Sequence, residues 1–119
     1  MPTKVYDSTQ YHEEGNLFRE IAIDIPATAT KVMCHSEFSG DANGQPHGGD
    51  YSSVVSRIYY DHLVVKDFNF GFDKHYDCIW TNEVDLKQHA GKPMNFKMRY
   101  GNHNAVTTND RFLVEVTTP

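Results

Sequence analysis

The stretch that decides the fold is Met94-Asn95-Phe96-Lys97-Met98-Arg99-Tyr100. Apolar and polar side chains alternate along it one by one, which places them on opposite faces of a half-buried β-strand. The same alternation recurs over residues 21–25, 68–72 and 112–116. A period of two therefore dominates this chain, and it predicts strands rather than helices.

Working outward, further candidate strands are residues 31–35, 53–60, 62–66 and 78–81, with turn-forming residues between them. A helical signal is confined to one turn, where Asp85 is placed as the N-cap and Gly91 as the C-terminal stop. Many short strands with connections every 8–12 residues or so are typical of sandwiches. We therefore predict an all-β fold, an antiparallel β-sandwich of the jelly-roll type.

Composition limits the class of protein further. The chain has 119 residues, enough for one ordinary core, so residues 1–119 are predicted to form a single domain. With 39% hydrophobic and 23% charged residues, a disordered tail is excluded. The longest aliphatic run is Leu63-Val64-Val65, far short of the roughly 20 apolar residues of a membrane-spanning helix. A net charge of −5 with 11 scattered Lys and Arg argues against a nucleic-acid partner.

The N-terminus and the cysteines bear on compartment. Residues 1–7 lack the apolar stretch of a secretory signal, so we expect a cytoplasmic protein or one exported without such a signal. Cys34 and Cys78 are too far apart in sequence for a zinc knuckle. Two buried free thiols are the favoured interpretation, and a single disulfide between them is the alternative.

Two oxygen-rich segments, residues 39–50 and 101–110, are predicted as long loops. Connections of about a dozen residues in a compact domain are usually functional or mobile. Calcium takes six to eight oxygen ligands, and an EF-hand is rejected because Ser52 stands where the loop needs Glu. Against an ion stands the turn-forming habit of Asn, Thr and Asp. The candidate metal ligands are Asn102, Asn104, Thr107, Asn109 and Asp110.

Residues 78–100 resemble a pattern common in galactose-binding-like jelly rolls, in which an aromatic strand leads to Val84-Asp85-Leu86 and then to Ala90-Gly91-Lys92. The order of parts also resembles the small bacterial calcium-dependent galactophilic lectins. In that family an oxygen-rich loop with a His-Pro element and a later calcium loop precede a strand of the form Phe-x-Val-x-Val. This chain departs from the family at Pro46-His47, which reverses that order, and at Asn102, which replaces an aspartate.

The resemblance implies a non-enzymatic lectin for a saccharide, with galactose-type sugars favoured. Bound calcium would accept two sugar hydroxyls, His47 would hydrogen-bond a third, and the ring of Trp80 or Tyr51 would pack on the pyranose. The implied sugar-binding residues are Asp41, Asn43, His47, Asp50, Tyr51, Trp80 and His103.

Each such site binds weakly, so a homo-oligomer is expected as the source of avidity. Two other classes stay open at this point. One is a structural jelly-roll subunit of a virion or appendage type. The other is a small hydrolase using His47 or His103 with Asp50 or Asp110, although no catalytic sequence motif supports it.

Overall fold

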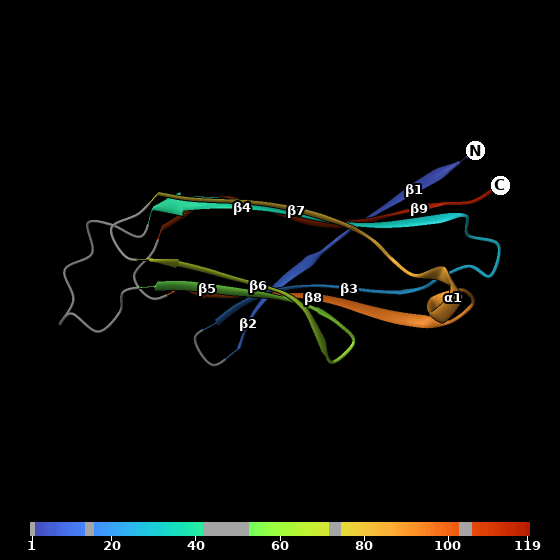
Figure 1. Ribbon diagram of the computed structural model, residues 1–119, viewed down its shortest axis with the longest axis horizontal. Helices are drawn as coiled ribbons and strands as arrows, with labels where there is room; N and C mark the ends of the chain where they lie inside the picture. Colours follow the sequence, from blue (N-terminus) through green and yellow to red (C-terminus); the bar gives the residue numbers. More distant parts are fainter. Residues whose placement is uncertain (1, 14–15, 42–52, 72–74, 103–105) are drawn as a thin grey trace.

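Two antiparallel sheets lie face to face in the computed structural model (Figure 1). It describes residues 2–13, 16–41, 53–71, 75–102 and 106–119, with the backbone alone for residues 40–41, 53–55, 69–71, 75–78, 100–102 and 106–109. The four-stranded sheet has the order β1 (Thr3–Asp7), β9 (Val106–Thr117), β4 (Lys31–Asp41), β7 (His75–Glu83). The five-stranded sheet has the order β2 (Thr9–Glu13), β3 (Asn16–Asp24), β8 (Pro93–Asn102), β5 (Ser53–Tyr60), β6 (Leu63–Gly71).

This strand order is that of a jelly roll. The orders β1-β9-β4-β7 and β3-β8-β5-β6 make up two interleaved four-stranded sheets, and β2 is added at one edge. The described strands change sheet at six of their eight connections, all but β2–β3 and β5–β6, so each sheet is completed by segments far apart in the sequence. The predicted all-β sandwich is confirmed.

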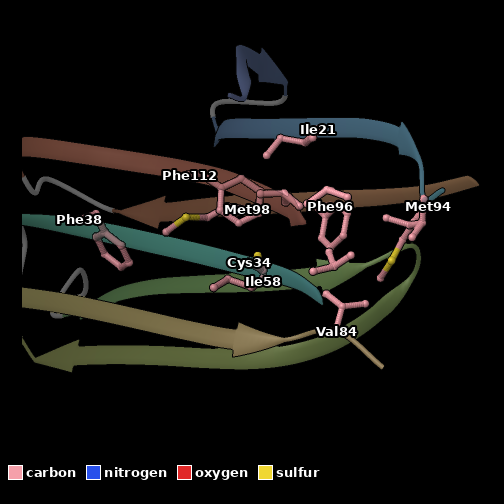
Figure 2. Close-up of a cluster of buried hydrophobic side chains, with 13 residues drawn as sticks. Ile21, Cys34, Phe38, Ile58, Val84, Met94, Phe96, Met98 and Phe112 are labelled. Atoms are coloured by element: carbon pink, nitrogen blue, oxygen red, sulfur yellow. The ribbon is translucent and has the colours of Figure 1, made fainter. Parts of the chain in front are cut away.

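The core fills the space between the sheets. In Figure 2, labelled side chains from both layers, among them Phe38, Phe96 and Phe112, lie in that space. Alternate residues of β8 and β9 are buried there, as the period of two predicts. The buried cluster consists of Ile21, Ile25, Val32, Cys34, Phe38, Ile58, Val84, Met94, Phe96, Met98, Phe112, Val114 and Val116.

The single helical turn forms where the sequence places it. Helix α1 (Leu86–His89) begins after Asp85, whose side chain accepts a hydrogen bond from the backbone N–H of Lys87. Gly91 has a φ of +75°, the left-handed conformation that favours glycine. Its N–H donates to the carbonyl of Ile25, which joins this turn to the end of the β3 segment.

Several strand boundaries differ from the sequence prediction. The two strands predicted over residues 62–66 and 68–72 are replaced by one strand, β6, over Leu63–Gly71. The N-terminal residues were not predicted as strands, yet β1 and β2 pair with β9 and β3. Their side chains are mostly exposed, so hydrophobic periodicity could not reveal them. The chain crosses from one sheet to the other at Ser8, between these two strands.

The prediction of a long loop over residues 101–110 was wrong. Residues 101–102 complete β8 and residues 106–110 begin β9. Val106 and the threonines after it favour strand geometry, and their backbone pairs with the end of β4 up to Asp41. For the same reason residues 39–41 belong to β4 and not to a loop.

Register also settles the cysteine question. Cys78 stands opposite Phe38 on β4, whereas Cys34 stands opposite Asn82. Four residues of extended strand separate Cys34 from Phe38, about 13 Å along the strand at roughly 3.3 Å per residue. A disulfide needs Cα atoms within about 7 Å, so these two residues cannot form one. Cys34 is a fully buried free thiol.

We expect Phe112→Ala to lower the free energy of unfolding by about 3–5 kcal/mol, because it opens a cavity in the centre of the core. Phe112 is 0% exposed, whereas Ile79 on the same sheet is 72% exposed. Ile79→Ala is therefore the matched control, with an expected change within about 0.5 kcal/mol. Urea unfolding of both variants measures the difference, and equal losses would contradict this description of the core.

Burial raises the pKa of the Cys34 thiol from 9.0 to about 12. Above pH 9 the thiol ionises in the unfolded chain but stays neutral in the folded one, so its contribution to stability is lost as the pH rises from 9 to 12. We expect the free energy of unfolding to fall less steeply over this range in Cys34→Ala. Urea unfolding at several pH values, with Cys78→Ser as the common background, measures the two slopes. Identical slopes would show that the folded thiol ionises normally.

Candidate functional site

The outer face of the five-stranded sheet carries a hollow of about 390 Å³. Side chains that alternate with the core residues of β3, β8 and β5 form its floor, and the turn between β5 and β6 closes one side. We call it the sheet-face hollow. It is lined by Glu13, Asn16, Phe18, Tyr59, Asp61, His62, Lys97 and Arg99.

Strand register places one row of side chains straight across this face. Tyr11 on β2 stands opposite Phe18 on β3, and Phe18 stands opposite Arg99 on β8. Arg99 in turn stands opposite Arg57 on β5, which pairs with Asp67 on β6. The row therefore runs from an aromatic end on β2 and β3 to a charged end on β5 and β6.

The aromatic end of the row is a stacked pair. The rings of Tyr11 and Phe18 have centroids 5.1 Å apart and lie within 10° of parallel. The ammonium of Lys97 lies 5.6 Å from the centre of the Phe18 ring, close enough for a cation–π attraction. Desolvation raises the pKa of Tyr11, and the carboxylate of Glu20 raises it further, so the phenol stays neutral. The two rings therefore form an apolar surface with the ammonium of Lys97 beside it.

The charged end of the row contains two arginines on adjacent strands. Arg57 donates from Nε to the Asp67 carboxylate over 2.8 Å. Arg99 is half-buried, and its Nε is shielded from solvent without a hydrogen-bond acceptor in the part of the chain that the structure describes. Like charges on directly opposed residues of antiparallel strands repel one another.

The turn at the edge of the hollow is held by Asp61. This residue has a φ of 54°, and its backbone N–H donates to the carbonyl of Asn95 over 2.7 Å. Its carboxylate accepts from the N–H of Asn95 over 2.9 Å, and the Asn95 amide donates to Glu20 over 2.5 Å. These contacts fix the turn against β8, so one wall of the hollow is preorganised.

Six of the predicted sugar and metal residues are described by the structure, and four of them, Asp41, Asn102, Thr107 and Asn109, lie at one end of the sandwich. Asp41, the last residue of β4, pairs with Val106, and Asn102 at the end of β8 pairs with Val54. Thr107 and Asn109 pair with Gly40 and Ser39 on β4. Figure 1 shows these ends of β4, β5, β8 and β9 at the same end of the molecule. Asn43, His47, Asp50, Tyr51, His103 and Asn104 lie outside the described residues.

Asp110 has a different partner from the one expected of a metal ligand. Its carboxylate lies 2.6 Å from Nε of Arg19, on the inner face of the opposite sheet. Arg19 also donates to the hydroxyl of Ser8 over 3.3 Å and to the amide oxygen of Gln10 over 3.1 Å. This half-buried ion pair joins the two sheets beside the point where the chain crosses between them.

Trp80 lies away from that end of the sandwich. It stands opposite Ser36 in the middle of β4, and its ring centroid is 6.5 Å from that of Tyr60. The ring packs against the core cluster and not at the end of the sandwich where a sugar was predicted to bind. Within the described residues, no group of three or more His, Cys, Asp or Glu side chains is arranged to hold a metal ion.

Sequence reasoning did not single out the residues of the sheet-face hollow. The alternation over residues 94–100 already placed Lys97 and Arg99 on the polar face of their strand. Phe18 and Tyr59 gave no such signal, because their neighbours across the strands come from distant parts of the chain. The grouping could be seen only once the order β2-β3-β8-β5 was known.

Comparisons with known proteins add little about function. No family model and no curated protein matches the chain. Among solved structures it is similar to an isomalto-dextranase of Arthrobacter globiformis T6 complexed with panose, with 9% identity and a TM-score of 0.39. The match covers 92% of this chain but 18% of that one, so this chain spans less than a fifth of that protein. No described helix is long and apolar enough to cross a bilayer.

We expect Arg19→Met and Asp110→Asn each to lower the free energy of unfolding by about 1–3 kcal/mol, with a coupling energy of about 1 kcal/mol or more in the double mutant. The reason is that either change leaves a half-buried charge without its partner. Urea unfolding in EDTA and in calcium measures the effect. Additive losses, or a loss for Asp110→Asn in calcium alone, would contradict a structural ion pair.

Proposed function

We propose that this chain is a non-enzymatic carbohydrate-binding protein that recognises a saccharide through the sheet-face hollow. The observation that carries the proposal is the row of stacked Tyr11 and Phe18 rings beside Lys97 and Arg99 in an open hollow. A pyranose has an apolar face of C–H groups and a rim of hydroxyls. It therefore needs an aromatic surface flanked by polar groups, which is what this row supplies.

The residues that line the hollow favour binding of a saccharide over catalysis. The hollow lies on a rigid sheet face, where strand pairing holds each side chain in place. His62 and Asp61 are its only described histidine and aspartate, and the Asp61 carboxylate already accepts the N–H of Asn95. The predicted hydrolase alternative named Asp110, whose carboxylate is paired with Arg19. We therefore favour binding without catalysis.

A second part of the proposal concerns the adjacent end of the sandwich. Arg99 and Asn102 are three residues apart on β8, about 10 Å at roughly 3.3 Å per residue. A ligand of several sugar units is long enough to reach from the hollow toward the ends of β4 and β9. Calcium remains the candidate ion there, and galactose-type sugars remain the favoured neutral ligands. Several copies in one homo-oligomer would raise the avidity.

Screening against a glycan array, followed by calorimetry with the best oligosaccharides, tests the proposal. We expect Phe18→Ala to weaken saccharide binding about tenfold or more, a loss of about 1.4 kcal/mol or more, because the apolar surface of the hollow is removed. We expect Tyr59→Ala to weaken binding in the same direction.

The matched control is Leu63→Ala, which truncates an exposed side chain on the edge strand β6, outside the lining of the hollow. It should bind as the wild type does. Circular dichroism checks that each variant is folded. Repeating the titration in EDTA separates the two parts of the proposal, since binding that survives chelation requires no calcium. Concentration-dependent assembly without affinity for any glycan would favour the structural-subunit alternative instead.

A further inference from the structure

The sheet-face hollow contains one arginine, Arg99, whose positive charge has no carboxylate partner among the described residues. Arg57 and Arg99 stand directly opposite each other on β5 and β8, so their positive charges repel. Arg57 is compensated by Asp67 at 2.8 Å. Arg99 has no such carboxylate, and its Nε is buried without an acceptor in the described part of the chain. Within the described residues, the positive charge of Arg99 is therefore not neutralised by a carboxylate.

The carboxylates near Arg99 have other partners or positions. Glu20 accepts from the amide of Asn95 and stands opposite Lys97, not Arg99. Asp61 is held by the backbone of Asn95 in the turn. Glu13 is exposed on the edge strand β2, opposite Asn16. Together with Asp67, which is paired with Arg57, these are the described carboxylates that line or border the hollow, and none has a hydrogen bond to Arg99.

The side chains beside Arg99 indicate the chemistry of a ligand that would bind there. Phe18 stands opposite Arg99 on β3, and Lys97 is two residues away on the same face of β8. A ligand whose anionic group binds Arg99 would therefore place the rest of its structure against the Phe18 ring. A guanidinium offers parallel N–H donors that match the two oxygens of a carboxylate.

We infer that the ligand of the sheet-face hollow is an acidic saccharide, whose carboxylate is bound by Arg99 while its pyranose ring packs on Phe18. This inference rests on the proposed function and narrows it from saccharides in general to uronic acids. The carboxylate neutralises the charge of the Arg99 guanidinium and reduces the repulsion between Arg99 and Arg57. Lys97 lies close enough to the same ring to strengthen the preference for a negative charge.

Calorimetry with three probes tests the inference: an oligogalacturonate, the neutral galactose oligomer of equal length, and a sulfated galactose oligomer. We expect the wild type to bind the oligogalacturonate at least tenfold more tightly than the neutral oligomer. Raising the salt concentration should reduce this preference, because it depends on charge. Equal affinity for the acidic and neutral probes would overturn the inference, and a preference for the sulfated probe would overturn the assignment to a carboxylate.

Variants at position 99 separate the effect of the positive charge from the effect of two parallel hydrogen bonds to a carboxylate. Arg99→Gln should remove the preference for oligogalacturonate while leaving the weaker affinity for the neutral oligomer. Arg99→Lys should restore part of the preference, because it keeps the charge but not the paired donors. The matched control is Arg111→Gln, an exposed arginine on the outer face of the other sheet, which should keep the full preference.

Thermal unfolding gives an independent readout. Oligogalacturonate should raise the midpoint of the wild type and of Arg111→Gln but not that of Arg99→Gln. Without ligand, Arg99→Gln should unfold at or above the wild-type midpoint, since one of two opposed charges is gone. A preference retained in Arg99→Gln would overturn the role of Arg99. If neither acidic nor neutral saccharides bind the wild type, the proposed function fails together with this inference; if both bind equally, this inference alone fails.

Discussion

Strand β8 imposes the constraint on which both the core and the sheet-face hollow depend. Met94, Phe96 and Met98 are almost completely buried between the sheets. Because successive side chains of a strand point to opposite faces, Lys97 and Arg99 must then lie on the outer face. A shift of one residue in the pairing of β8 would bury both cations and expose the aromatic and thioether groups. The packing of the core therefore fixes the register that positions the cationic side of the hollow.

The ion pair between Arg19 and Asp110 joins two charged side chains on the inner faces of the two sheets. Arg19 precedes Ile21 by two residues and Asp110 precedes Phe112 by two, so both belong to the inward-facing series. Each charge is only partly exposed, and their direct contact offsets the desolvation. The additional bonds of Arg19 to Ser8 and Gln10 attach the crossing between β1 and β2 to this contact. A residue expected to bind a ligand thus has a structural partner.

Candidate binding residues lie in two places, the outer face of the five-stranded sheet and one end of the sandwich. The face has a rigid floor, because β3, β8 and β5 are each paired on both sides and the turn at Asp61 is hydrogen-bonded to β8. The end is defined by the last residues of β4 and β8 and the first residues of β5 and β9. The proposed saccharide site is assigned to the face because stacked rings and cations lie side by side there. The short distance along β8 makes the face and the end two parts of one proposed binding region.

Local sequence pattern by itself determined the fold class, the buried series of β8 and β9, and the capped turn from Asp85 to Gly91. Each of these depends on neighbours within a few residues, through alternation, capping and the conformational freedom of glycine. Tertiary structure alone decided the partners: it placed Asp110 against Arg19, kept Cys34 and Cys78 apart, and brought Phe18 beside Arg99. The physical reason is that strand order and register join residues as many as 114 positions apart, as in the pairing of Thr3 with Thr117, and no local preference encodes which strands will pair.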